Sequence, residues 1–169
     1  VLQKIYNEVA TLEGELADFR RTQDYLPVRG EGSVVADIMF IGEAPGENEA
    51  KQGRPFVGRS GRFLNEMLDE IDLQREDVYI TNVVKDRPPK NRDPRSDEID
   101  IYAQFLDKQI ETIQPKIIGL LGRFSMEYVF SRYGQSISVG TITEMHGTVH
   151  QVEVLGVQTM LVPLFHPAV

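Results

Sequence analysis

The sequence has 169 residues, a formal net charge of −8 and no cysteine. Its hydrophobic content of 41% and charged content of 26% are typical of a globular protein, and its apolar runs are too short to cross a bilayer. The lack of cysteine excludes disulfides, thiolate nucleophiles, and thiolate-bound zinc or iron–sulfur clusters. We therefore expect a single cytoplasmic domain over residues 1–169.

Apolar periodicity predicts one amphipathic helix over residues 1–20 and further helices over residues 60–71, 96–113 and 124–132. Strands are expected at residues 37–42, 78–84, 116–121 and 159–165, with a hairpin turning at Leu155-Gly156 before the last one. Because helices alternate with four β-rich runs, we expect an α/β fold. It should be a three-layer α/β/α sandwich with a central, mainly parallel four-stranded sheet.

Polar side chains follow three of these strands. Glu43 lies in the Gly/Pro turn after the first strand, Asn82 is near the end of the second, and His166 comes directly after the last. The carboxyl ends of parallel strands meet at one edge of a sheet, so these groups are expected to converge there. Taken singly, each has an ordinary structural explanation: a helix cap for Glu43, backbone satisfaction for Asn82, a strand cap for His166 and a core position for Phe56.

Positive charge is concentrated in two segments of this acidic chain. Residues 51–62 contain four cations and no acid, and residues 85–95 contain five cations against two acids. Such loops either form a narrow phosphate-binding face or are simply solvated. The candidate DNA contacts among them are Arg54, Arg59, Lys85, Arg87, Lys90 and Arg92.

Several motifs, in order along the chain, resemble the family 4 uracil-DNA glycosylases. They are Gly42-Glu43-Ala44-Pro45-Gly46 with Glu49, Gly53-Arg54-Pro55-Phe56-Val57-Gly58, Ile80-Thr81-Asn82-Val83-Val84-Lys85, Arg87-Pro88-Pro89 and His166-Pro167-Ala168. One glycine-rich turn alone would be a weak signal, but this series from about Gly30 to the last residue is specific. The resemblance implies an enzyme that hydrolyses the N-glycosidic bond of uracil in DNA.

The resemblance also implies a role for each matching position. Glu43 would activate water or stabilise charge, and His166 would donate a hydrogen bond to uracil O2. Asn82 would read the edge of the base, Phe56 would stack on it, and Gly42 and Glu49 would lie beside it. The expected partner is uracil-containing DNA, single-stranded or mismatched because less unpairing is needed, bound by a monomer.

The sequence departs from the family in two respects. The family binds a [4Fe–4S] cluster through four cysteines, but the corresponding positions here are Asp86, Tyr102 and, less surely, Glu15 and Asp18. Carboxylates and a phenol suit iron–sulfur chemistry poorly, so we expect no cluster, no metal and no other cofactor, with polar contacts of Arg87 or Arg92 tying the loop to the first helix. A hard cation among Glu15, Asp18 and Asp86 is the alternative. The family also continues past His-Pro-Ala with a DNA-wedging loop and a helix; neither is visible in these 169 residues, so the intercalating residue is not assigned.

Two other functions remain open at this stage. The loss of the cluster and the acidic charge favour a non-enzymatic descendant that binds nucleic acid or a nucleobase. Retention of Glu43, Asn82 and His166 together disfavours that alternative, because a pure binding protein has little use for the carboxylate. The third alternative is a hydrolase of small nucleosides or nucleotides that uses the same pocket.

Overall fold

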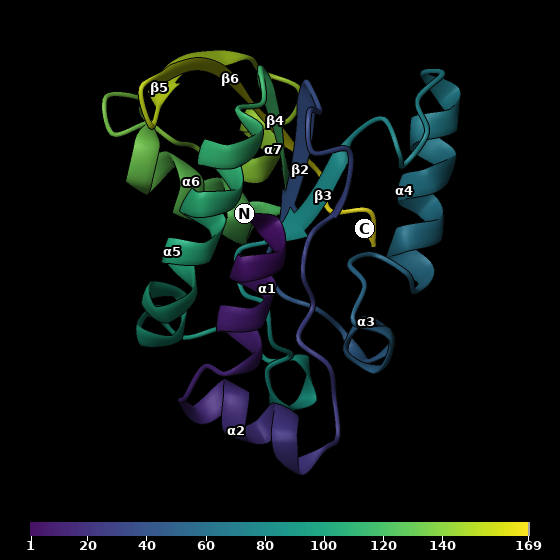
Figure 1. Cartoon of the computed structure of the whole chain (residues 1–169). Coiled ribbons are helices and arrows are strands. Elements are labelled where there is room, and N and C mark those ends of the chain that lie inside the picture. The colour runs from purple at the N-terminus through teal and green to yellow at the C-terminus, as the bar shows by residue number, and fades with distance from the viewer. Residues whose placement is uncertain (169) are drawn as a thin grey trace.

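A six-stranded sheet with helices on both faces forms the body of the computed structural model, which describes residues 1–168 (Figure 1). The strand order is β1-β3-β2-β4-β6-β5. The four inner strands are parallel, whereas β1 and β5 pair antiparallel at the edges. The strands are β1 (Glu31–Gly32), β2 (Ile38–Gly42), β3 (Tyr79–Asn82), β4 (Ile117–Leu121), β5 (His150–Val154) and β6 (Val157–Leu164).

The predicted α/β fold is confirmed, and the sheet is wider than four strands because it gains an edge strand on each side. The hairpin of β5 and β6 turns at Leu155-Gly156 as predicted, and it adds β5 to one edge. Strand β1 lies between the predicted first helix and first strand, where no element was predicted, and it pairs with β3 at the other edge. The predicted four strands correspond to the parallel centre of the sheet.

The helices occupy both faces of the sheet and largely match the predicted ranges. The prediction of a single helix over residues 1–20 was wrong, because Gly14, at φ +131°, interrupts it. The short helices α3 and α7 were not predicted. The helices are α1 (Leu2–Ala10), α2 (Glu15–Thr22), α3 (Glu47–Gln52), α4 (Arg59–Glu70), α5 (Ser96–Ile113), α6 (Arg123–Tyr133) and α7 (Ile142–Met145), with a 3₁₀ turn at Pro89–Asn91.

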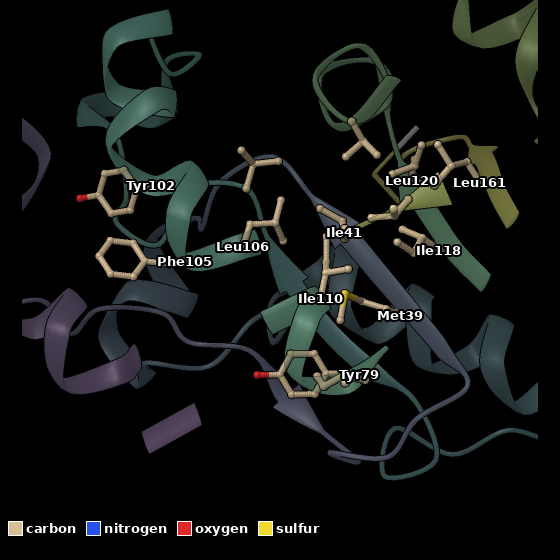
Figure 2. Packing of buried hydrophobic residues seen from close by; sticks show 14 of the residues in the cluster. Met39, Ile41, Tyr79, Tyr102, Phe105, Leu106, Ile110, Ile118, Leu120 and Leu161 are labelled. Carbon is tan, nitrogen blue, oxygen red and sulfur yellow. The ribbon is translucent and has the colours of Figure 1, made fainter. Parts of the chain in front are cut away.

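Alternate residues of the strands pack into two apolar layers. Met39 and Ile41 of β2 face the larger layer with Leu106 and Ile110 of α5 (Figure 2). Phe40 faces the opposite layer, with Leu64 and Leu68 of α4. The central strands are thus buried on both sides, as parallel strands usually are.

The order in which successive strands are added to the sheet reverses at β2, and this switch point determines where a ligand site is expected. From β2 the chain passes through α3 and α4 to β3 on one side, then through α5 to β4 on the other side. A crevice forms at such a switch point, beyond the carboxyl ends of the strands, and it is the usual ligand site of these sheets.

None of the helices over residues 1–168 is long and apolar enough to span a bilayer.

Candidate active site

The ends of β2, β3 and β6 bring the predicted site residues to one rim of the sheet. Gly42 is in register with Asn82 on the neighbouring strand, and Glu43 follows Gly42 directly. On the other side of β2, Leu121 of β4 is in register with Leu164 of β6, two residues before His166. Residues more than 120 positions apart in the sequence therefore meet at this rim.

Two adjoining cavities open at the rim. The first has a volume of about 370 Å³ and is lined by Glu49, Phe56, Asn82 and His166 among others. The second, of about 250 Å³, is lined by Glu43, Asp93 and His166 among others. The residues common to both walls are Ala44, Pro45, Gly46, Asn91 and His166.

Gly42 allows the amide of Asn82 and the ring of Phe56 to approach the same point. A Cβ atom placed on Gly42 would lie 2.4 Å from Oδ1 of Asn82 and 2.6 Å from Cζ of Phe56. Both side chains are almost fully buried, although both line the first cavity. The amide and the aromatic ring are thus held at the floor of the cavity by close packing.

Phe56 is fixed in an uncommon backbone conformation. Its φ is +49°, in the left-handed region, which needs support from surrounding contacts. The Arg75 guanidinium donates to the carbonyl oxygens of Phe56 (3.0 Å) and Pro55 (2.8 Å). The carboxylate of Glu49 accepts from the N–H groups of Val57 (3.3 Å) and Gly58 (3.2 Å). Glu49 therefore stabilises the loop that carries Phe56, and it also lines the first cavity.

A backbone hydrogen bond fixes the tautomer of the neutral His166 imidazole. Its Nδ1 accepts a hydrogen bond from the backbone N–H of Ala168 at 3.1 Å, so in the neutral ring the proton resides on Nε2. Burial lowers the pKa of His166, which favours this neutral form. The ring centroid lies 6.0 Å from that of Phe56, so an Nε2–H donor and an aromatic ring border the same cavity.

Glu43 has the electrostatics of a functional carboxylate. Burial, together with the nearby charge of Asp93, raises its pKa to about 7, and Arg123 partly opposes the rise. Among residues 1–168 no donor forms a hydrogen bond with this carboxylate, so the solvation it loses is not replaced. Carboxyl groups with such pKa values are concentrated at active sites.

Two of the loop cations that were predicted to contact DNA are exposed and make no ion pair with any described residue, namely Arg59 and Lys90. Three others bind protein partners. Arg54 forms a bidentate pair with Glu31, Arg92 pairs with Glu98, and Arg87 donates to Asn91 and Tyr25. These three can reach DNA phosphates only where their guanidinium groups remain accessible.

The prediction that Lys85 contacts DNA is wrong, because its side chain is 1% exposed. Its ammonium donates to Oγ1 of Thr81 (2.8 Å), the backbone carbonyl of Asn82 (2.5 Å) and Oε1 of Gln109 (2.7 Å). Burial lowers its pKa to about 7, whereas three oxygen acceptors match the three donors of an ammonium group. Lys85 therefore supports the end of β3 from inside the protein.

The sequence did not single out Asn91 or Asp93 as site residues. Asn91 borders both cavities, Asp93 borders the one beside Glu43, and Arg123 begins α6 close enough to influence Glu43. Asn91 and Asp93 lie in the proline-rich segment that was expected to be an exposed loop. Only the folding of this loop over the rim reveals their position.

Comparisons with known proteins identify the family to which this chain is similar. The model of the uracil DNA glycosylase superfamily matches residues 29–169. The Type-4 uracil-DNA glycosylase of Sulfurisphaera tokodaii is 47% identical over 169 residues, covering 99% of this chain and 74% of the relative. That of Archaeoglobus fulgidus is 43% identical, covering 89% and 74%, and that of Thermotoga maritima is 45% identical, covering 83% and 69%.

Proposed function

Because the chain belongs to the uracil DNA glycosylase superfamily, we propose that its rim site hydrolyses the N-glycosidic bond of uracil in DNA and leaves an abasic site. The observation that supports this most is the meeting of a carboxylate, an amide, an aromatic ring and an Nε2–H donor around two adjoining cavities. These are the groups needed to hold a flipped pyrimidine and to stabilise both charges of glycosidic cleavage.

Asn82 is proposed to select the base. Its amide oxygen can accept from uracil N3–H while its amide nitrogen donates to O4. Cytosine carries an acceptor at N3 and a donor at C4, so it would leave both groups unpaired. A buried site built to hydrogen-bond its substrate rejects such a mismatch strongly. Phe56 would stack on the base and recover part of the free energy spent in unstacking it.

His166 is proposed to stabilise the leaving group. When the bond between C1′ and N1 breaks, its electron pair moves to uracil and the negative charge spreads to O2. A neutral imidazole with its proton on Nε2 can donate to that oxygen without transferring the proton. One preorganised donor of this kind is worth roughly 3–4 kcal/mol in the transition state.

Glu43 is proposed to act on the sugar side of the bond. As a carboxylate it would oppose the positive charge that develops on the sugar, and it would accept a proton from the water that adds to C1′. The water supplies the hydroxyl group left on the sugar, and its proton neutralises the uracil anion after release. The reaction needs no cofactor, because water is the nucleophile and uracil is a competent leaving group.

We propose that DNA approaches along the face that carries Arg59 and Lys90. Single-stranded or mismatched DNA would be the easier substrate, because less base pairing must be broken before the base enters the cavity. The acidic net charge of −8 confines any attraction for phosphate to this local face. The protein is proposed to act as a monomer.

The test is alkali-revealed cleavage of a single-stranded oligonucleotide that contains one uracil, compared with the same strand containing cytosine or thymine. Cleavage only at uracil, with rates that fall steeply as salt rises, is the expected result. Free deoxyuridine, assayed in parallel, would be hydrolysed with little salt dependence if the protein were a nucleoside hydrolase. Folded protein that cleaves neither uracil, hypoxanthine nor xanthine would contradict the proposal.

A further inference from the structure

The four positions that correspond to the family's cluster cysteines do not form a ligand set in this chain. Glu15 pairs with Arg95, and Asp18 pairs with Arg21, both on the surface. Asp86 and Tyr102, in contrast, are buried and contact one another. No group of three His, Asp or Glu residues within residues 1–168 could hold a metal ion.

A guanidinium group occupies the position beside Asp86 where a bound cation would be needed. Arg20 of α2 is 4% exposed, and its Nη1 lies 3.0 and 3.2 Å from the two carboxylate oxygens of Asp86. The hydroxyl of Tyr102 donates to the same carboxylate. With one cation already bound and both oxygens used, Asp86 has little capacity left for a metal ion.

The same guanidinium also binds the end of α1. Nη1 donates to the carbonyl oxygen of Val9 at 3.1 Å, and Nη2 donates to that of Ala10 at 2.9 Å. These carbonyls belong to the last turn of the helix, where a cation is favoured. Arg20 therefore joins α1, α2 and the loop after β3 through a single planar group.

Tyr102 connects this cluster to the core. It projects from α5 beside Phe105, with its hydroxyl directed away from Leu106 and Ile41 (Figure 2). Burial and the charge of Asp86 raise the pKa of Tyr102, so the hydroxyl keeps its proton and remains a donor. Burial also raises the pKa of Asp86, while the donors Tyr102 and Arg20 oppose that rise.

We propose that Arg20, Asp86 and Tyr102 form a metal-free clasp that replaces the structural role of an iron–sulfur cluster in this chain. The clasp fixes Asp86, which is four residues from Asn82 and five from Asn91, and so positions both ends of the loop that closes the site. The expectation that Arg87 or Arg92 ties this loop to the first helix holds for Arg92, which pairs with Glu15 at 4.0 Å on the surface. The buried connection, which was not expected, is made by Arg20 to Asp86.

Substitutions within the clasp test its contribution to the stability of the fold. Arg20→Met leaves a buried carboxylate without its cation and should lower the melting temperature by roughly 10 °C, given the usual cost of breaking a buried pair. Arg21→Met is the matched control, since Arg21 is the next residue of the same helix and forms an exposed pair. The double variant Arg20→Met with Asp86→Asn should be no less stable than Arg20→Met, because the two residues act as a unit.

A second readout separates positioning of the site from stability alone. Tyr102→Phe retains the ring and removes one hydrogen bond, so the protein should remain folded. At a temperature well below its melting point, KM for uracil-containing DNA should rise several-fold while kcat changes less. Metal analysis should find no stoichiometric iron in the purified wild type, and chelators should leave its melting temperature unchanged.

Two results would overturn the proposal. One is a melting temperature for Arg20→Met equal to that of Arg21→Met, because the clasp would then make no special contribution to stability. The other is stoichiometric metal whose removal destabilises the wild type. Melting temperature and metal content are both independent of catalysis, so an inactive protein would count against the proposed function and not against the clasp.

Discussion

Gly42 and Asn82 are directly opposite each other on adjacent parallel strands, and the space above Gly42 is filled by the Asn82 amide. A methyl group at Gly42 would lie 2.4 Å from Oδ1 of that amide, well inside contact distance. We predict that Gly42→Ala displaces Asn82 and the Phe56 ring and reduces kcat/KM on uracil-containing DNA by at least tenfold. Steady-state kinetics would check this.

The matched control for that variant is Gly156→Ala at the hairpin turn. No heavy atom lies within 4 Å of a Cβ placed there, so this change adds only backbone strain at φ +82°. It should lower stability modestly and leave kcat/KM unchanged. Equal loss of activity in both variants would show that packing at Gly42 has no special role.

The pKa of Glu43 predicts how activity depends on pH. The proposed mechanism needs the ionised carboxylate, and that form becomes dominant above about pH 7. The kcat/KM of the wild type should therefore rise with pH through this value, and Glu43→Gln should abolish the rise and reduce kcat by about 10²–10⁴. A wild-type profile that is flat between pH 5.5 and 8.5 would contradict the assignment.

The same pKa has a consequence for stability with the opposite sign. The folded-state pKa of about 7 lies above the ordinary value of 4.5, so folding opposes ionisation of Glu43. Its stabilising contribution is complete below pH 4.5 and is lost as pH rises through 7. Chemical denaturation across this pH window should show that the free energy of unfolding falls with pH in the wild type more than in Glu43→Gln.

Asp93 and Arg123 should move the pH profile in opposite directions. The charge of Asp93 raises the pKa of Glu43, and that of Arg123 lowers it. Asp93→Asn should therefore shift the acid limb of kcat/KM to lower pH, and Arg123→Gln should shift it to higher pH. Shifts of the same sign in both variants would argue against direct electrostatic coupling to Glu43.

Lys85 predicts a second pH effect, this time on stability alone. Its folded-state pKa of about 7 lies below the ordinary value of 10.5, so stability should increase as pH rises from 7 toward 10.5. Lys85→Met should remove that increase and leave the carbonyl of Asn82 without its donor, at a cost of about 1–3 kcal/mol. Lys116→Met, which removes an exposed ammonium, should keep the wild-type increase of the unfolding free energy with pH, measured by urea denaturation.

The sequence predicted most closely those elements whose burial follows a simple period. The apolar spacing over residues 96–113 reproduces α5 at both ends, and the β-rich runs correspond to the four parallel strands. The end of each strand then placed Glu43, Asn82 and His166 at one rim, because parallel topology leaves little choice. The break between α1 and α2 was missed, since the apolar spacing continues through Gly14.

What the sequence could not predict are the charged residues that fold inward. Lys85 and Arg20 look like surface cations in polar stretches, and their burial depends on acceptors that are distant in the chain. Asn91 and Asp93 reach the site only because the proline-rich loop folds over the rim. Such long-range partners leave no local pattern by which they could be recognised.

The most direct test of the account is the single-turnover rate of uracil release from one single-stranded oligonucleotide. It should be measured for the wild type, Glu43→Ala, Asn82→Ala and His166→Ala, after thermal melting has shown each to be folded. We predict release by the wild type and a loss of about 10²-fold or more in each variant, as expected for groups that act in the transition state. Unchanged rates in all three folded variants would contradict the assignment of the active site to this rim.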